Sequence, residues 1–155
     1  MNLAIISERT FERARSEIRK AAGLGKKVIF TSGDDELNRK ILEKEKVEIL
    51  MPLLKGRRDF QKQRNSGFNH VLAKLAEKSN VVIGVNLNEI IDSKGKEMAS
   101  VLSRVSQNIR LCAKNRLKMK FLASNRENAR DIYDLKALGS VLGMPTWMTK
   151  SLSDD

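Results

Sequence analysis

The sequence is poor in the residues that metal-dependent and covalent catalysis require. It contains a single histidine, His70, and a single cysteine, Cys112. A catalytic metal site needs several histidine or carboxylate ligands that converge, and the carboxylates near the expected strand ends match no ligand spacing. Gly23 and Gly25 precede a strand instead of following one, so they do not form a phosphate-binding loop. We therefore expect no catalytic residue, no metal and no cofactor bound by this chain itself.

Other absences concern the membrane and the cell compartment. A single cysteine cannot form an intrachain disulfide, which favours a reducing, intracellular setting. No apolar run approaches the ~18 residues that a membrane-spanning helix needs. The N-terminus has no basic leader and reaches a charged residue at Glu8, which is not typical of a signal peptide. These features predict a soluble cytoplasmic protein.

Aromatic residues are scarce, whereas basic residues are abundant and unevenly placed. Aromatics make up 5% of the chain, so stacking on unpaired bases is not the expected main mode of nucleic-acid binding. The net charge is +11, and residues 51–130 alone hold 17 basic and 6 acidic side chains. Clustered Lys and Arg gain affinity for phosphates through counterion release, and the alternative is a merely solvated basic face. The uneven partition favours nucleic acid, and the scarcity of aromatics then favours backbone and shape recognition of folded RNA.

Strand-like and helix-like segments alternate along the chain. Short apolar runs predict five strands, at 3–6, 27–31, 47–51, 81–85 and 120–123. Helical spacing of apolar residues predicts helices at 8–22, 34–45, 67–78, 97–116 and 131–142, with a short helical turn within 86–91. We expect the strand at 3–6 to be buried and Ser66 to cap the helix at 67–78.

This alternation predicts one α/β domain over residues 1–155, with a parallel sheet and right-handed crossovers. The tail at 146–155 is expected to be disordered or loosely packed. A complete eight-unit barrel typically needs ~250 residues and at least ~200. The chain has 155 residues, so the pattern alone favours an open five-stranded sheet.

A basic loop at 55–64 runs directly into the helix at 67–78. The turns that follow parallel strands meet at one edge of the sheet, where α/β folds place their sites. Arginine side chains there favour bidentate contacts with phosphate. The candidate RNA-binding residues belong to this loop, to the exposed side of the next helix, to the polar side of the helix at 97–116 and to the segment after the fifth strand. They are Lys55, Arg57, Arg58, Lys62, Arg64, Asn69, His70, Lys74, Arg104, Asn108, Arg110, Arg126 and Arg130.

Two further expectations follow from the same charges. Lys114, Arg116, Lys118 and Lys120 end a helix, where cations suit the helix dipole, and we interpret them as solvated. Replacing Arg57 and Arg58 by alanine is expected to weaken RNA binding and to leave the fold intact.

Part of the chain resembles a known family. Residues 59–76, above all Ser66-Gly-Phe-Asn-His-Val-Leu-Ala-Lys-Leu-Ala76, are similar to the signature of the archaeal and eukaryotic ribonuclease P protein component 3 family. Later segments agree in order with that family, at 82–91, 108–112 and 133–144. The resemblance covers roughly residues 28–145.

The resemblance implies a TIM-barrel-like fold, akin to polymerase and histidinol phosphatase (PHP) domains but without their metal ligands. It implies a subunit of the ribonucleoprotein that removes the 5′ leader from precursor tRNA. In that particle the RNA holds the catalytic Mg²⁺ ions. The protein would brace the catalytic RNA and pair with a small α+β partner subunit.

The sequence departs from the family in two places, and two other functions remain open. Family members usually begin with additional strand–helix units, so we expect an incomplete barrel or one that a partner closes. The turn at 124–128 differs from the Ser-Gly-Ala-like turn of the family. The alternative functions are a stand-alone metal-dependent phosphoesterase of the PHP class and a basic scaffold that binds another RNA.

Overall fold

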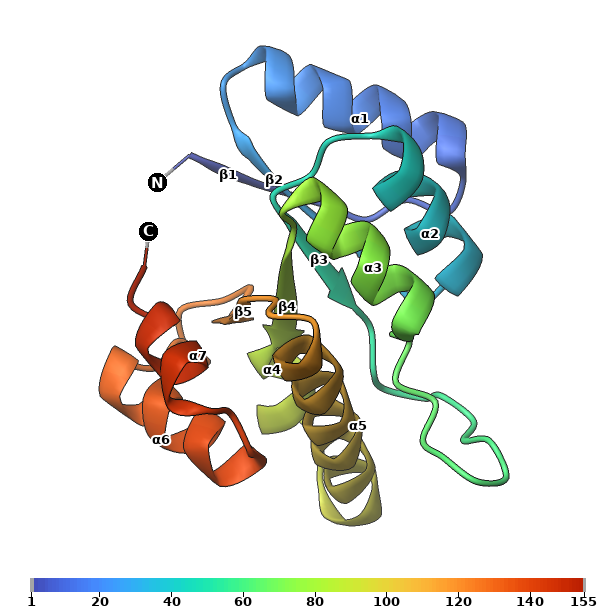
Figure 1. The fold of residues 1–155 in the computed structure, drawn as a ribbon. Helices are drawn as coiled ribbons and strands as arrows, with labels where there is room; N and C mark the ends of the chain where they lie inside the picture. The colour runs from blue at the N-terminus through green and yellow to red at the C-terminus, as the bar shows by residue number, and fades with distance from the viewer. Residues whose placement is uncertain (1, 155) are drawn as a thin grey trace.

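The computed structural model describes residues 2–154 (Figure 1). Its five strands form one parallel sheet in the order β1-β2-β3-β4-β5. The strands are β1 (Leu3–Ile6), β2 (Lys27–Ser32), β3 (Ile49–Pro52), β4 (Val82–Asn86) and β5 (Met119–Leu122). The helices are α1 (Phe11–Gly23), α2 (Asp35–Lys44), α3 (His70–Ser79), α4 (Leu87–Ile91), α5 (Gly95–Lys114), α6 (Ile132–Leu142) and α7 (Thr146–Ser151).

The sequential strand order resembles one wall of a barrel. Each crossover moves the chain to the next position in the sheet, and right-handed connections then place the helices on the same face. Figure 1 shows α1, α2, α3 and α5 following one another around the outside of the sheet. Within residues 2–154, β1 and β5 do not pair with each other, so the sheet stays open. The predicted α/β class and incomplete barrel are therefore confirmed.

The two faces of the sheet carry cores of different size. Side chains alternate along each strand, so Phe30 of β2 joins the large core beneath the helices, whereas Ile29 faces the opposite side. Ile29 packs there with Ile49 and Met51, and with the partly buried Leu122. This smaller cluster occupies the face that would be the interior of a closed barrel.

The structure corrects three expectations about local structure. The strand at 3–6 is not buried, because β1 is an edge strand, and Leu3 and Ile5 are 39% and 51% exposed. The tail at 146–155 is not loose over the residues described, because α7 packs on α6 and buries Met148 completely. The helix expected from residue 67 begins at His70 with Asn69 as its cap instead of Ser66, because Gly67 takes a left-handed conformation (φ +66°).

The apolar face of α3 gives a stability prediction. Leu72 belongs to the large core beneath the helices and is 2% exposed, whereas its neighbour Val71 is 52% exposed. Leu72→Ala should lower the free energy of unfolding by about 2–5 kcal/mol, because it removes buried methyl groups and leaves a cavity. The matched control, Val71→Ala, should change it by less than about 0.5 kcal/mol. Urea denaturation of both variants measures the difference, and equal losses would contradict this packing.

Candidate nucleic-acid interface

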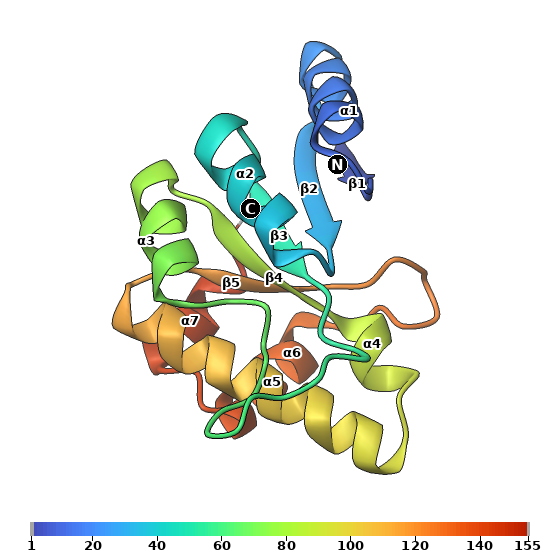
Figure 2. The ribbon, with the colours of Figure 1, turned by 90° about the vertical axis from the view of Figure 1, so that its right-hand side faces the viewer.

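The chain between β3 and α3, residues 53–69, forms a long connection without regular secondary structure. Figure 2 shows it lying across α5. Loops longer than about 12–15 residues inside a compact domain are usually functional or disordered. This one is anchored to the domain by polar contacts, which involve α2, α4 and α5.

Arg57 ties the loop to the start of α2. Its side chain is only 8% exposed, and its guanidinium pairs with Asp35 at 3.0 Å. It also donates hydrogen bonds to the carbonyl oxygens of Leu53 and Gly33 and to the side chain of Asn65. Arg57 therefore has a structural role, whereas its neighbour Arg58 is exposed. Loss of Arg57 acts on the fold, so the expectation that an Arg57–Arg58 double variant leaves the fold intact is withdrawn.

Arg104 fastens the loop to α5. Its guanidinium donates to the carbonyl oxygens of Leu54 and Arg57, both at 2.8 Å, and pairs with Asp59 at 3.1 Å. Asn108, one turn later, donates to the carbonyl oxygen of Ser66 at 3.1 Å. Arg104 and Asn108 are 4% and 3% exposed, so the polar side of the helix on which they were predicted to lie is covered at these two positions and does not present them to RNA. That side of α5 is polar because a polar loop covers it.

Glu89 of α4 holds the beginning of the loop. This carboxylate is 8% exposed and accepts hydrogen bonds from the backbone N–H groups of Leu54, at 3.0 Å, and Lys55, at 2.7 Å. A buried carboxylate is stable only when it is paired or hydrogen-bonded, and these donors fulfil that requirement. The sequence offers no local signal for this contact, because 35 positions separate Glu89 from Leu54.

Asp59 closes the turn at the tip of the loop. It accepts a hydrogen bond from the backbone N–H of Asn65 and pairs with Arg64 and Arg104. These contacts, the Asn65 N–H first and then the two guanidinium groups, lower the pKa of Asp59 to about 2. The ionised carboxylate is therefore part of the folded loop.

The lowered pKa of Asp59 predicts a pH dependence. The pKa of Asp59 is lower in the folded protein than its usual value of 3.8, so the ionised carboxylate stabilises the fold above about pH 3.8. This stabilisation disappears as the pH falls toward about 2. The stability advantage of the wild type over Asp59→Asn should thus be constant near neutral pH and shrink between about pH 4 and pH 2. Urea denaturation across this range measures it. Asp134→Asn, at an exposed position on α6, is the matched control and should show no comparable trend.

Several other candidates also have partners within the protein. Lys55 lies 3.9 Å from Glu97, and Lys74 lies 3.3 Å from Glu77. Asn69 caps α3 by accepting a hydrogen bond from the N–H of Leu72 at 3.0 Å. Such exposed ion pairs are weak, yet they reduce the net charge that the loop offers to a polyanion.

The remaining candidates are exposed and pair with no carboxylate among residues 2–154. They are Arg58, Lys62, His70, Arg110, Arg126 and Arg130. Arg126 and Arg130 follow β5, and Arg130 lines a small pocket between α4 and α6 with Leu87 and Leu138. The structure therefore does not gather all the predicted residues into one site.

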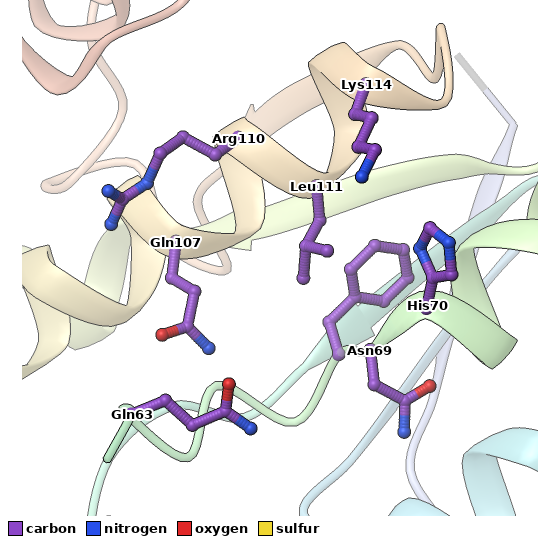
Figure 3. Close-up of a pocket in the computed structure, with 8 residues that line it drawn as sticks. Gln63, Asn69, His70, Gln107, Arg110, Leu111 and Lys114 are labelled. Atoms are coloured by element: carbon purple, nitrogen blue, oxygen red, sulfur yellow. The ribbon is translucent and has the colours of Figure 1, made fainter.

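A groove lies between the start of α3 and the second half of α5 (Figure 3). Its volume is about 680 Å³, and its lining includes two predicted residues of the α3 N-terminus, one of α5 and no carboxylate. The lining residues are Gln63, Phe68, Asn69, His70, Gln107, Arg110, Leu111 and Lys114. Sequence reasoning missed Gln63, Gln107 and Lys114. The spacing of four between Arg110 and Lys114, which places both on one helix face, was the available signal.

A second concave site lies at the carboxyl ends of β1 and β2, where barrel enzymes place their catalytic groups. It measures about 720 Å³ and is lined in part by Arg9, Arg13 and Asp34. The Asp34 carboxylate caps α2 by accepting a hydrogen bond from the N–H of Leu37.

Over residues 2–154, no three His, Cys, Asp or Glu side chains are placed to hold a metal ion. None of the helices described there is long and apolar enough to cross a membrane.

Comparison with known proteins gives consistent matches. A family model described as RNase P subunit p30 matches residues 28–153. Ribonuclease P protein component 3 of Methanococcus vannielii is 31% identical over 75% of this chain and 46% of its own length. The protein of the same name from Methanothermobacter thermautotrophicus is 31% identical over 88% of this chain and 50% of its own length. The chain thus spans about half the length of these curated relatives.

A solved structure shares the fold. A chain in the cryo-EM structure of archaeal Ribonuclease P with mature tRNA superposes with a TM-score of 0.78 and 24% sequence identity. The superposition covers 96% of the present chain and 62% of that one. The open sheet described above therefore corresponds to part of a larger fold in that protein.

Proposed function

The chain belongs to the RNase P subunit p30 family, and on this premise we propose that it is a protein subunit of ribonuclease P, the ribonucleoprotein that removes the 5′ leader from precursor tRNA. The family match over residues 28–153 carries the proposal. It agrees with the resemblance that the motif at 66–76 indicated from the sequence.

The role that we propose is to brace the catalytic RNA. The net charge of +11 and the exposed, unpaired cations favour attachment to a phosphate backbone, which rewards such groups through counterion release. We assign the cleavage step to the RNA and the Mg²⁺ ions that it holds. The proposed partners are ribonuclease P RNA, precursor tRNA through the complex and other protein subunits, including a small α+β protein. The proposed compartment is the cytoplasm.

The proposed RNA-binding surface is narrower than the set of basic residues in the sequence. Arg57, Arg104 and Asn108 hold the loop in place, and their side chains are almost entirely covered. Arg58 and Lys62 are exposed on the loop, and Arg110 is exposed on α5 beside it. The loop is thus anchored to the domain and carries its own exposed cations.

A binding experiment tests this proposal. The purified protein should bind ribonuclease P RNA with an affinity that falls steeply as salt rises, and it should cleave no precursor tRNA on its own. Binding at ~0.1–0.2 M salt no tighter than that of an unrelated acidic protein would refute the proposal. Sequencing of RNA that co-purifies with the protein distinguishes ribonuclease P RNA from another RNA, and hence this role from that of a general basic scaffold.

The phosphoesterase alternative has its own test. A metal-dependent enzyme of the PHP class would hydrolyse phosphate esters. A chelator would abolish this activity, and so would the substitution His70→Ala. His70 lies at the start of α3 beside Phe68, Leu111 and Lys114 and has no carboxylate around its groove. This environment lacks the converging ligands that such chemistry requires.

A further inference from the structure

Two cations near the end of α5, Arg110 and Lys114, differ from most cations of the basic loop in forming no ion pair. Lys55, Arg57 and Arg64 each pair with a carboxylate at 3.9 Å or less. Arg110 and Lys114 form no ion pair with any residue between 2 and 154, and both are exposed. Uncompensated positive charge therefore lies on the helix surface beside the groove as well as on Arg58 and Lys62 of the loop.

The geometry of the groove suggests a ligand with repeated charges. Arg110 and Lys114 are separated by one helical turn, a rise of about 6 Å along α5. In Figure 3, Lys114 extends toward the end of the groove that holds His70, and Arg110 extends toward the end that holds Gln107. Two cations that reach opposite ends of one groove suit two phosphates of a single strand better than one isolated anion.

Three amide side chains share the lining of this groove with the cations. Gln63, Asn69 and Gln107 line the groove, and Phe68 and Leu111 give it an apolar floor. Phe68 is 5% exposed, so it offers little surface on which a base could stack. The side-chain oxygen of Asn69 is occupied by the Leu72 N–H, which leaves its NH₂ group available as a donor. The NH₂ group of Gln107 already donates to the carbonyl oxygen of Arg64 and to Oγ of Ser66, so Gln107 offers its side-chain oxygen as an acceptor. Amide donors and acceptors can both bond a ribose 2′-hydroxyl, the group that distinguishes RNA from DNA.

We propose that this groove binds the ribose–phosphate backbone of one RNA strand, which crosses it along α5. Phosphates of the strand contact Arg110 at one end and Lys114 with His70 at the other, and the amide side chains contact the riboses between these phosphates. The inference rests on the proposed function, because it takes an RNA ligand as given, and it adds Lys114, Gln63 and Gln107 to the residues that contact RNA.

The test removes the two cations and measures both RNA binding and direct occupancy of the groove. Arg110→Gln combined with Lys114→Gln should lower the slope of log affinity against log salt by about 1.4 for ribonuclease P RNA, since each single-strand phosphate contact contributes about 0.7. The control is Lys20→Gln combined with Lys40→Gln, which removes two exposed cations from α1 and α2. The control should leave the slope within error, and thermal unfolding verifies that both variants stay folded.

Direct occupancy is measured by NMR titration of the full chain with ribose 5-phosphate, oligouridylate and oligodeoxyuridylate of equal length. The amide signals of residues 69–71 and 107–114 should shift, and oligouridylate should bind more tightly than its deoxy counterpart. Equal effects of the groove and control variants on the salt slope would overturn the inference, as would shifts confined to other residues. Equal affinity for the two oligonucleotides would overturn the assignment of the amides to ribose.

The outcomes also separate this inference from the proposed function. If the protein prefers ribonuclease P RNA but the groove variant binds it as the control does, the proposed function stands and the groove site is wrong. If the protein shows no preference for that RNA while the groove variant loses oligouridylate binding, the groove site stands and the proposed function fails.

Discussion

Replacing Arg104 by methionine should loosen the entire connection between β3 and α3 and lower the free energy of unfolding by about 2–4 kcal/mol. Methionine preserves much of the length of the side chain and has a similar helix propensity, so the change isolates the guanidinium. Without it, the carbonyl oxygens of Leu54 and Arg57 and the carboxylate of Asp59 each lose a donor. Urea denaturation measures the stability, and trypsin cleavage at the loop measures its exposure.

Arg110→Met is the matched control for this prediction, because Arg110 lies on the same helix and is exposed. It should change the unfolding free energy by no more than about 0.5 kcal/mol. Its effect should instead be a weaker affinity for RNA. The two variants thus separate an arginine that builds the loop from an arginine that faces the ligand. If Arg104→Met retained full stability and a protected loop, the hydrogen bonds assigned to Arg104 would not hold the loop.

The sequence predicted the architecture well because the architecture depends on patterns that are local. The apolar runs at 27–31 and 81–85 correspond to β2 and β4 with small shifts at their ends. Their alternation with helical spacing was sufficient to predict parallel pairing. The burial of β1 could not be predicted in the same way, because it depends on what covers Leu3 and Ile5, and that is a property of the whole sheet.

The sequence predicted the site less well, and Arg104 shows the reason. Hydrophobic periodicity distinguishes the apolar face of α5 from its polar face, but it cannot tell whether the polar face meets water or a polar loop. Arg104 and Asn108 lie under the loop, whereas Arg110 lies beyond it. The interpretation of Lys114 as a merely solvated end of the helix has the same limit. Only the path of residues 53–69 over the helix decides between these environments.

Gly67→Ala is the second substitution with a large expected effect on stability, because backbone strain and a steric clash would both arise at this position. The backbone of Gly67 is left-handed (φ +66°), and a Cβ atom there would clash with Nη2 of Arg57. The guanidinium is the end of a flexible side chain, but its hydrogen bonds to Leu53, Asn65 and Asp35 keep it from moving freely. Gly67→Ala should therefore lower the unfolding free energy by about 2–4 kcal/mol, of which about 1–2 kcal/mol is backbone strain.

A double-mutant cycle separates the two costs. In an Arg57→Ala background the clash is absent, so Gly67→Ala should cost only the strain of about 1–2 kcal/mol. Gly56→Ala is the matched control, since Gly56 is also left-handed (φ +73°) but a Cβ atom there would meet no other atom within 4 Å. Gly56→Ala should lower the unfolding free energy by the backbone strain alone, both in the wild type and in the Arg57→Ala background. If Gly67→Ala cost the same with and without Arg57, the guanidinium would not be packed against Gly67.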